Sequence, residues 1–246
     1  MLNYIKKTYR NSKESFYTVL EDRLKEDKKM FIVTANPETF MKADSIKEFD
    51  EALMRDDTVI VPDGIGIVKA ANFIGIKEIK ERITGVEVSY KLLELANKYK
   101  KSIYLLGASK EVINLTVKNI KRDYPNIVIS GYTDGYVEDK DKIFEEIKQI
   151  KPDIVLVALG VPKQEILINK HYKDFNKGIF VGVGGTFDVI SGTKKRAPEI
   201  VQKLNIEWLY RIAGDKERIK RFYESNVKFM FKLKKLKKLD KNNIEE

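Results

Sequence analysis

Short, nearly continuous apolar runs alternate along this chain with longer segments in which apolar residues recur at helical spacing. Six runs are rich in Val, Ile, Leu and Phe and cover residues 30–35, 58–63, 102–108, 126–132, 153–160 and 178–185. Helical patterns cover 88–101, 110–124, 141–150 and 162–175. Strands that are apolar on both faces are typical of a parallel sheet covered by helices on both sides. The alternation therefore predicts an α/β fold with a doubly wound, mostly parallel, Rossmann-like sheet.

The last part of the chain follows a different pattern. Five apolar side chains fall on one arc of a predicted helix: Phe222, Phe229, Met230, Leu233 and Leu236. Basic side chains fall on the other side: Arg221, Lys228, Lys232 and Lys235. Residues 211–246 hold 12 Lys and Arg against 6 Asp and Glu, and so carry +6 of the net charge of +10. We therefore expect an α/β domain at 1–195 and a C-terminal basic amphipathic helical appendage at 196–246.

This appendage has three interpretations. A basic amphipathic helix is typical of binding to an anionic membrane surface, and nucleic acid is the rival partner. A helix that packs on the core and solvates its basic face is the third. Phe and Met on the apolar arc favour the bilayer, so we expect a membrane partner and no nucleic acid.

Composition narrows the chemistry that is available. The 246 residues include no cysteine and one histidine, His171, which excludes disulfides, thiolate zinc sites and a cysteine nucleophile. No apolar run approaches the ~18 residues of a membrane span, and the N-terminal segment has no signal-peptide core. We expect a cytoplasmic protein in which carboxylates act as bases, and a structural or solvent-facing role for His171.

Ligands of doubly wound sheets bind beyond the carboxyl ends of the strands. Gly182 to Gly185 follow the last apolar run, but the third glycine of a G-x-G-x-x-G fingerprint is replaced by Phe187. The glycines therefore indicate a tight turn, or backbone amides against a diphosphate or sugar with Asp188 beside them, rather than a dinucleotide site. Arg196, a little further on, is either a phosphate contact or part of a structural ion pair.

Asp63 ends the second run and directly precedes a glycine-rich helix start. It either caps the following helix or acts as a general base that takes a proton from an attacking hydroxyl. Arg82 precedes Thr84-Gly85, a plausible helix start, and is either a surface arginine or a phosphate ligand.

Pro162 is suited to a first helical position, and Gln164 and Glu165 follow in the first turn. Gln164 could bind a sugar hydroxyl or a base edge, whereas Glu165 could simply suit the helix dipole. The one D-x-D motif, 139–141, starts a lysine-rich helix, which is typical of a solvated helix end. We predict no catalytic metal and no cofactor.

Three arginines of the tail differ from its lysines. Arg211, Arg218 and Arg221 are spaced seven and three residues apart, on one side of a continuous helix. Guanidinium groups bind phosphate with two hydrogen bonds. Gly214 is a possible interruption of that helix.

Six ordered motifs resemble the WecG/TagA/CpsF family, glycosyltransferase family 26, and most closely its teichoic-acid branch. They are TANPE, VPDGIGIV, RITGVEV, GVPKQE, GVGGTFDVISGTKKRAPE and EWLYRI with two later arginines, and they cover about residues 30–221. Ser191 stands where alanine is expected, and Ile166 where many members carry tryptophan.

The resemblance implies an inverting, metal-independent glycosyltransferase of teichoic-acid linkage synthesis. Such an enzyme moves N-acetylmannosamine from UDP-N-acetylmannosamine to the 4-hydroxyl of N-acetylglucosaminyl-diphosphoryl-undecaprenol. It would attach peripherally to the inner face of the cell membrane through the appendage. A homo-oligomer is compatible with the sequence, which does not determine the oligomeric state. Inversion needs one base, which agrees with Asp63.

The resemblance also implies roles for particular residues. The sugar pocket would be lined by Thr34, Asn36, Arg82, Gln164 and Asp188. The nucleotide would lie at Gly107, Tyr136, Gly160, Gly184 and Gly185. The lipid diphosphate would be reached by Arg211, Arg218 and Arg221.

Other functions remain compatible with the sequence. A different UDP-N-acetylhexosamine or uronate could be the donor in another surface-polysaccharide pathway. A nucleotide-dependent oxidoreductase on the same fold is weakened by the failed fingerprint, and a non-enzymatic basic adaptor would need only the tail.

Overall fold

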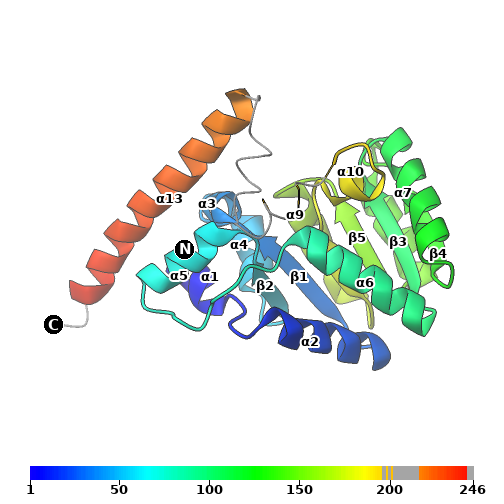
Figure 1. Cartoon of the computed structure of the whole chain (residues 1–246), viewed down its shortest axis with the longest axis horizontal. Coiled ribbons are helices and arrows are strands. Elements are labelled where there is room, and N and C mark those ends of the chain that lie inside the picture. The colour runs from blue at the N-terminus through cyan, green and yellow to red at the C-terminus, as the bar shows by residue number, and fades with distance from the viewer. Residues whose placement is uncertain (196–197, 199–200, 202–215, 243–246) are drawn as a thin grey trace.

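Six parallel strands form a single sheet in the order β2-β1-β6-β5-β3-β4 (Figure 1). The structure, a computed structural model of the chain, describes residues 1–195, 198, 201 and 216–242. The strands are β1 (Met30–Ala35), β2 (Thr58–Pro62), β3 (Ser102–Gly107), β4 (Val128–Thr133), β5 (Ile154–Ala158) and β6 (Ile179–Gly182). All six coincide with the apolar runs of the sequence, and every pairing is parallel, so the predicted sheet is confirmed.

Helices cover both faces of this sheet. One face carries α1 (Leu2–Lys7), α3 (Pro37–Ala43), α4 (Lys47–Met54), α5 (Ile65–Phe73), α8 (Lys140–Ile150) and α9 (Lys163–His171). The other carries α2 (Lys13–Lys25), α6 (Gly85–Tyr99), α7 (Lys110–Asp123) and α10 (Thr186–Ile190). Alternate residues of β1 enter the two cores, with Phe31 and Val33 on the first face and Ile32 on the second. The predicted double winding is therefore confirmed.

Local hydrogen bonds move two helix ends away from the predicted positions. Helix α6 begins at Gly85, three residues before the apolar periodicity, because Thr84 and Glu87 form a reciprocal capping box. The pattern predicted over 162–175 ends at His171 and continues as a 3-10 turn, η1 (Tyr172–Asp174). Pro162, which follows a cis peptide bond, precedes α9 rather than starting it.

The connections at the carboxyl edge of the sheet diverge between β1 and β6. The chain leaves β1 into α3 on one face and leaves the neighbouring β6 into α10 on the other. In open α/β sheets this divergence is the usual position of the ligand. The fold therefore brings the segments after β1 and β6 together as the centre of a candidate site.

The long C-terminal helix α13 (Lys216–Asn242) packs against α3 and α5 (Figure 1). Phe229 and Leu233 are buried in the first core, and the ring of Phe229 lies 6.4 Å from that of Phe40 on α3. Met230 of the predicted arc also packs against this core, whereas the side chain of Phe222 lies outside the described residues. The members Phe229, Met230 and Leu233 of the arc therefore contact the protein. Lys232, predicted on the basic side, pairs with Asp44.

No described helix carries an apolar stretch sufficient to cross a bilayer. The outward face of α13 nevertheless exposes Tyr223, Phe231 and Leu239. Among the described side chains of this helix, these three large apolar groups are exposed, whereas Phe229 and Leu233 are buried.

Replacing Phe229 by alanine should loosen α13. Removing a buried ring costs about 3 kcal/mol or more, so protection of the α13 amides against hydrogen exchange should fall on the order of 100-fold. Phe231→Ala, on the same helix but 69% exposed, is the matched control and should leave exchange unchanged. Equal protection in both variants would mean that Phe229 does not hold the helix.

Candidate functional site

Asp63 lies at the end of β2 and is bound by two other segments. Its N–H donates to the carbonyl of Ala35 at 2.8 Å, and its Oδ2 accepts from the N–H of Gly85 at 3.3 Å. Gly64 continues the turn with a φ of 111°. The carboxylate thus caps α6, 22 residues away, whereas the sequence suggested a cap on the helix that follows directly. The partial positive charge of a helix N-terminus favours a carboxylate at this position.

Thr34 links this carboxylate to the last strand. Its Oγ1 donates to the carbonyl of Gly182 at 3.3 Å, and a methyl group placed on Gly85 would lie only 3.2 Å from the same oxygen. Asp63 therefore binds Gly85, and the Thr34 hydroxyl occupies the space beside it. Arg82 lies just before Ile83, whose N–H donates to the carbonyl at the end of β2, so its backbone borders this group.

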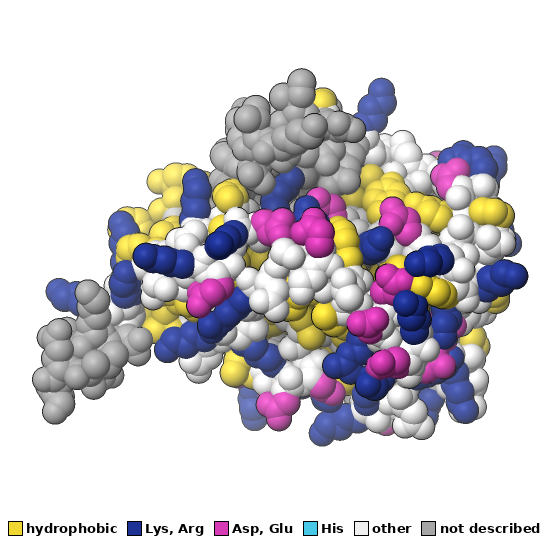
Figure 2. All heavy atoms as spheres, turned by 60° about the horizontal axis from the view of Figure 1, so that its bottom comes forward, with side chains coloured by type: hydrophobic (Ala, Val, Ile, Leu, Met, Phe, Trp, Pro, Cys, Tyr) yellow, Lys and Arg dark blue, Asp and Glu magenta, His cyan; other side chains and the backbone are white. Residues whose placement is uncertain are grey.

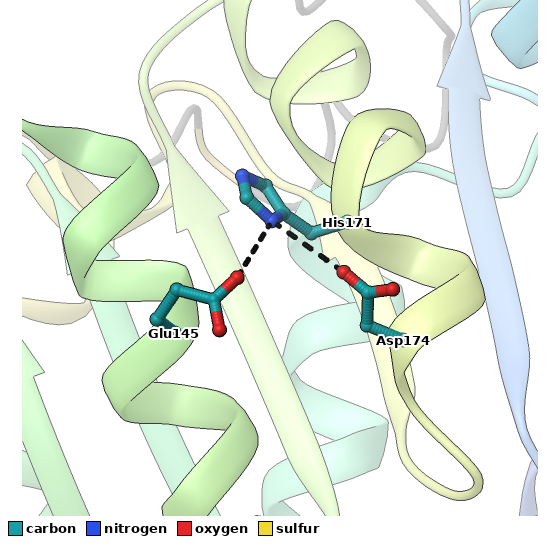
Figure 3. Close-up of side chains that lie close together, drawn as sticks. All are labelled: Glu145, His171 and Asp174. Carbon is teal, nitrogen blue, oxygen red and sulfur yellow. Dashed lines mark ion pairs between the residues drawn. The ribbon is translucent and has the colours of Figure 1, made fainter.

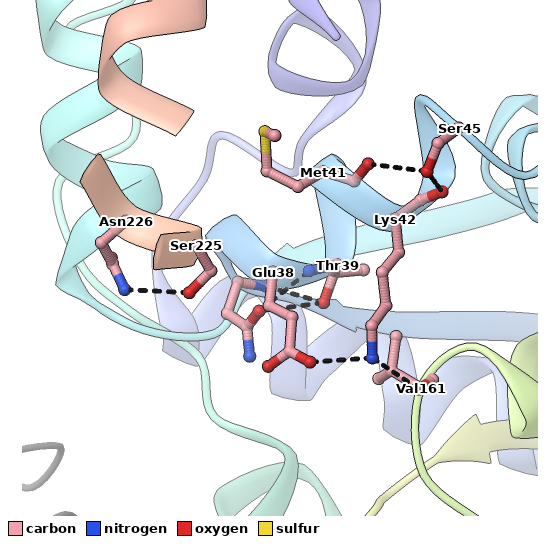
Figure 4. Close-up of polar contacts among 9 residues, drawn as sticks. Glu38, Thr39, Met41, Lys42, Ser45, Val161, Ser225 and Asn226 are labelled. Carbon is pink, nitrogen blue, oxygen red and sulfur yellow. Dashed lines mark hydrogen bonds and ion pairs between the residues drawn. The ribbon is translucent and has the colours of Figure 1, made fainter. Parts of the chain in front are cut away.

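Asn36 begins α3 and forms a capping box with Thr39. Its side-chain oxygen accepts from the N–H of Thr39 at 3.0 Å, which fixes the amide at the carboxyl end of β1. One turn further, Lys42 donates to the carbonyl of Val161 at 3.0 Å and pairs with Glu38 (Figure 4). Helix α3 therefore positions a polar group at the site and also holds the loop after β5.

Gln164 ties together the two glycine loops at the centre of the edge. Its Oε1 accepts from the N–H of Gly160 at 3.0 Å and from the N–H of Gly184 at 3.1 Å. Its Nε2 donates to Oε1 of Glu165 at 2.7 Å. The side chain is buried, so these two N–H groups and this amide are already engaged with one another. A ligand at this edge would therefore contact the two glycine loops, whose positions the side chain of Gln164 determines.

Glu165 is a fully buried carboxyl beside this amide. Its Oε1 accepts from Gln164, and its Oε2 has no hydrogen-bond partner in the described part of the chain. Burial raises the pKa of Glu165 to about 7, although the hydrogen bond from Gln164 and the charge of Lys42 act in the opposite direction. From sequence alone Glu165 was expected only to suit the helix dipole, because apolar periodicity does not reveal a buried acid.

Two more predicted positions, Gly107 and Tyr136, lie around the ends of β3 and β5. Gly107 has a φ of 127°, and a methyl group on it would lie 2.3 Å from the carbonyl oxygen of Ala158. The loop after β4 folds over this point, since the N–H of Gly135 donates to the carbonyl of Ala108 at 2.8 Å. Tyr136, next in that loop, is 82% exposed, so its ring is available for stacking.

Asp188 lies in the first turn of α10, close to Gly185. Its carboxylate pairs with Lys194, and its carbonyl accepts from the N–H of Lys194 and the hydroxyls of Ser191 and Thr193. These bonds close the segment that follows α10. The carboxylate is thus half-exposed and charge-balanced rather than isolated.

Four arginine candidates belong to the C-terminal part of the chain. Arg196 and Arg211 lie outside the described residues. Arg218 and Arg221 belong to the described backbone of α13, whereas their side chains do not belong to the described part.

His171 sits in a separate acidic cluster at the end of α9 (Figure 3). Its Nε2 lies 2.6 Å from Asp141, and its Nδ1 lies 3.8 Å from Glu145 and 3.9 Å from Asp174. Its ring stacks on Phe144. Three ligand atoms of this cluster lie within 4.8 Å of one another, which would suit a metal ion, but the contacts join α8 to α9 and η1. These contacts favour the structural role, one of the two that were expected for His171.

The D-x-D motif starts α8, as predicted. Asp139 caps this helix by accepting from the N–H of Lys142. Hydrogen bonds from Lys170 and His171 lower the pKa of Asp141. Both carboxylates of the motif therefore have structural partners: one caps α8, and the other binds side chains of α9.

The edge of the sheet thus presents one carboxylate in a turn, a threonine and an asparagine beside it, and two glycine loops joined by an amide. One carboxylate within reach of a bound hydroxyl can act as a general base. Lys42 and Glu165 were missed by the sequence reasoning. No local signal marks Lys42, because its partner Val161 is 119 residues away.

Comparison with known proteins gives a consistent result. The model of the glycosyl transferase WecG/TagA/CpsF family matches residues 4–243. Three similar proteins carry the name N-acetylglucosaminyldiphosphoundecaprenol N-acetyl-beta-D-mannosaminyltransferase. The protein of Bacillus spizizenii W23 is 42% identical over 84% of this chain and 80% of its own. The Bacillus subtilis 168 protein is 43% identical over 77% and 73%, and the Staphylococcus aureus MW2 protein 39% over 85% and 81%.

The close packing at the end of β6 can be tested with two glycines of one loop. A methyl group on Gly182 would lie 2.7 Å from Nε2 of Gln164 and 2.8 Å from Oε1 of Glu165, both buried. Gly182→Ala should therefore lower the free energy of unfolding by about 1–3 kcal/mol in chemical denaturation.

Gly185→Ala is the matched control, because the nearest atom, Oδ2 of Asp188, is 3.6 Å away and the φ is −76°. It should change the free energy of unfolding by less than about 0.5 kcal/mol. A Gly182→Ala protein as stable as this control would contradict the packing described.

Proposed function

Because the chain belongs to the WecG/TagA/CpsF family of glycosyl transferases, we propose that it transfers N-acetylmannosamine to N-acetylglucosaminyl-diphosphoryl-undecaprenol. The donor is UDP-N-acetylmannosamine and the acceptor atom is the 4-hydroxyl. The observation that carries this proposal is that relatives 39–43% identical over most of the chain bear the name of that enzyme. The carboxylate of Asp63, held at the carboxyl edge of the sheet by the N–H of Gly85, supports it.

The proposed reaction is one direct displacement. The acceptor oxygen forms a bond to the anomeric carbon as the bond from that carbon to UDP breaks. The hydroxyl proton passes to Asp63, and UDP departs with the electron pair of the broken bond. Inversion in a single step needs one base and no covalent intermediate. The Gly85 N–H, which binds Oδ2 of Asp63, orients the carboxylate for this proton transfer.

The remaining site residues divide into sugar and nucleotide contacts. Thr34, Asn36 and Asp188 hold the sugar, and Arg82 stabilises the charge that develops on the diphosphate. Gln164 shapes the site indirectly, because its side chain holds in place the two loops whose N–H groups it binds. Gly107, Gly160, Gly184 and Gly185 leave room for the nucleotide.

Two further groups complete the proposed substrate contacts. Tyr136 offers an exposed ring on which a uracil can stack. Arg211, Arg218 and Arg221 bind the lipid diphosphate. In this proposal residues 1–195 form the catalytic domain, and residues 196–246 are an appendage that supplies contacts to the acceptor.

We further propose that the outward face of α13 contacts the inner surface of the cell membrane, where the acceptor is anchored. This face combines the exposed apolar side chains Tyr223, Phe231 and Leu239 with exposed lysines, namely Lys220, Lys228, Lys234, Lys235 and Lys238. In Figure 2 basic side chains predominate at the end of the molecule that carries the C-terminus, whereas both signs mix elsewhere on that face. Each cation near anionic lipid contributes about 1 kcal/mol.

The role of Asp63 predicts a specific kinetic change. Asp63→Asn retains an oxygen that can accept from Gly85 but cannot take a proton, so kcat should fall about 100- to 10,000-fold. The dissociation constant of UDP, measured by calorimetry, should change less than about threefold, because the base does not bind the nucleotide. Asp139→Asn, at a helix cap away from the site, is the control and should retain full transfer. Near-normal kcat in folded Asp63→Asn protein would remove this base from the mechanism.

The membrane face predicts selective loss of lipid binding. Phe231→Ser should weaken co-sedimentation with vesicles that contain anionic phospholipid about tenfold or more, since burying a phenylalanine contributes about 1.5–3 kcal/mol. Binding should also weaken as salt rises, because lysines contribute to it. Ile150→Ser, also at an exposed apolar residue but on α8, is the control. Equal binding by both variants would move the membrane contact away from α13.

A further inference from the structure

A buried carboxyl group lies beneath the two glycine loops, and the proposed mechanism gives it no task. Glu165 is 0% exposed, and its Oε2 is one of two buried polar side-chain atoms in the described part of the chain that lack a partner. Burying such an atom unpaired costs free energy. The other oxygen, Oε1, accepts a hydrogen bond from the amide of Gln164 at 2.7 Å.

The amide of Gln164 has two unlike ends, and its orientation decides whether the loops can be joined. Its oxygen faces two N–H donors, those of Gly160 and Gly184. The reversed amide would set its NH2 group against both donors and lose both bonds. An acceptor beside the NH2 group fixes the productive orientation, and Oε1 of Glu165 at 2.7 Å is that acceptor.

We infer that Glu165 is a positioning residue of the donor site, which acts through Gln164 to fix the loop after β5 relative to the loop after β6. The inference rests on the proposed function, since it assumes that these loops hold the sugar nucleotide. It assigns Glu165 no contact with substrate.

The packing around Gly182 extends this arrangement to the catalytic side of the site. The side chains of Gln164 and Glu165 occupy the space that a side chain at position 182 would need. The carbonyl of the same Gly182 accepts from the hydroxyl of Thr34. A displaced Glu165 side chain would therefore disturb both the glycine loops and the end of β6 on which Thr34 rests.

The protonation state of Glu165 determines how strongly it accepts the hydrogen bond from Gln164. Lys42 on α3 is the charged group in the described chain whose field acts on this carboxyl, and Lys42 is itself paired with Glu38 and bound to Val161. Burial raises the pKa of Glu165 to about 7. The carboxyl is thus neutral below that pH and ionised above it, and the ionised form is the stronger acceptor for the Gln164 amide.

The experiment compares two substitutions at this position. Glu165→Leu removes the acceptor, and Glu165→Gln keeps one. In Glu165→Leu we expect the KM for the UDP-sugar and the dissociation constant of UDP to rise about tenfold or more, with kcat within about threefold. Glu165→Gln should restore both constants to within about threefold of the unaltered protein. Glu111→Leu, an exposed glutamate in the first turn of α7, is the control for loss of a helix N-terminal charge.

A second readout reports the loop positions without any activity. In protein labelled with 15N-glycine, the amide resonances of Gly160 and Gly184 should move in Glu165→Leu and stay in place in Glu111→Leu. In the unaltered protein the same two resonances should titrate together with a midpoint near pH 7, and Glu165→Gln should abolish that titration. This arm needs only the unaltered and glutamine proteins, so it holds even if Glu165→Leu does not fold.

Two outcomes would overturn the inference. One is a folded Glu165→Leu protein with an unchanged dissociation constant for UDP and unmoved resonances. The other is a pair of resonances that titrate alike in the unaltered protein and in Glu165→Gln. Failure of the proposed function would look different, because the unaltered protein would then form no glycoside product while the glycine resonances still reported on Glu165.

Discussion

The carboxyl edge of the sheet depends on one side-chain amide, that of Gln164. Two glycine loops leave β5 and β6 with backbone N–H groups that point inward, and a buried donor without a partner is costly. The single oxygen of Gln164 satisfies the N–H groups of Gly160 and Gly184 together. Glycine at 182 follows from the same constraint, because the amide and its neighbour Glu165 fill the space below β6. The shape of the candidate donor site is therefore a consequence of polar satisfaction.

The charge at the other side of the site follows from helix geometry. The first N–H groups of α6 have no partner within the helix, and Asp63 supplies an acceptor to one of them across 22 residues of sequence. The N–H of Gly85 binds the carboxylate, and the carbonyl of Ala35 and the tight turn at Gly64 hold the backbone of Asp63, so the position of the group does not depend on a flexible side chain alone. Such preorganisation suits a group whose proposed task is to take one proton in one step.

The sequence predicted the sheet well because each strand is buried on both faces and reads as a continuous apolar run. It also placed Asp63 and Gln164 at the edge of the sheet, since parallel strands end on one side. Their partners escaped prediction: the cap of Asp63 on α6 joins distant segments, and Glu165 looked like a helix-dipole acid. The arc of α13 was foreseen, but amphipathicity shows which face of a helix is apolar and not what covers it. Phe229 packs against Phe40 of α3, a contact between segments far apart in the sequence.

Helix α3 connects these features into one rigid unit. Its first residue follows Asn36 at the carboxyl end of β1, its middle packs Phe40 on Phe229 of α13, and its last turn sends Lys42 to the carbonyl of Val161 (Figure 4). A helix of seven residues therefore contacts the site, the loop after β5 and the C-terminal helix at once. Because packed helices transmit displacement rather than absorb it, the position of α13 and the geometry of the site are set by the same short element.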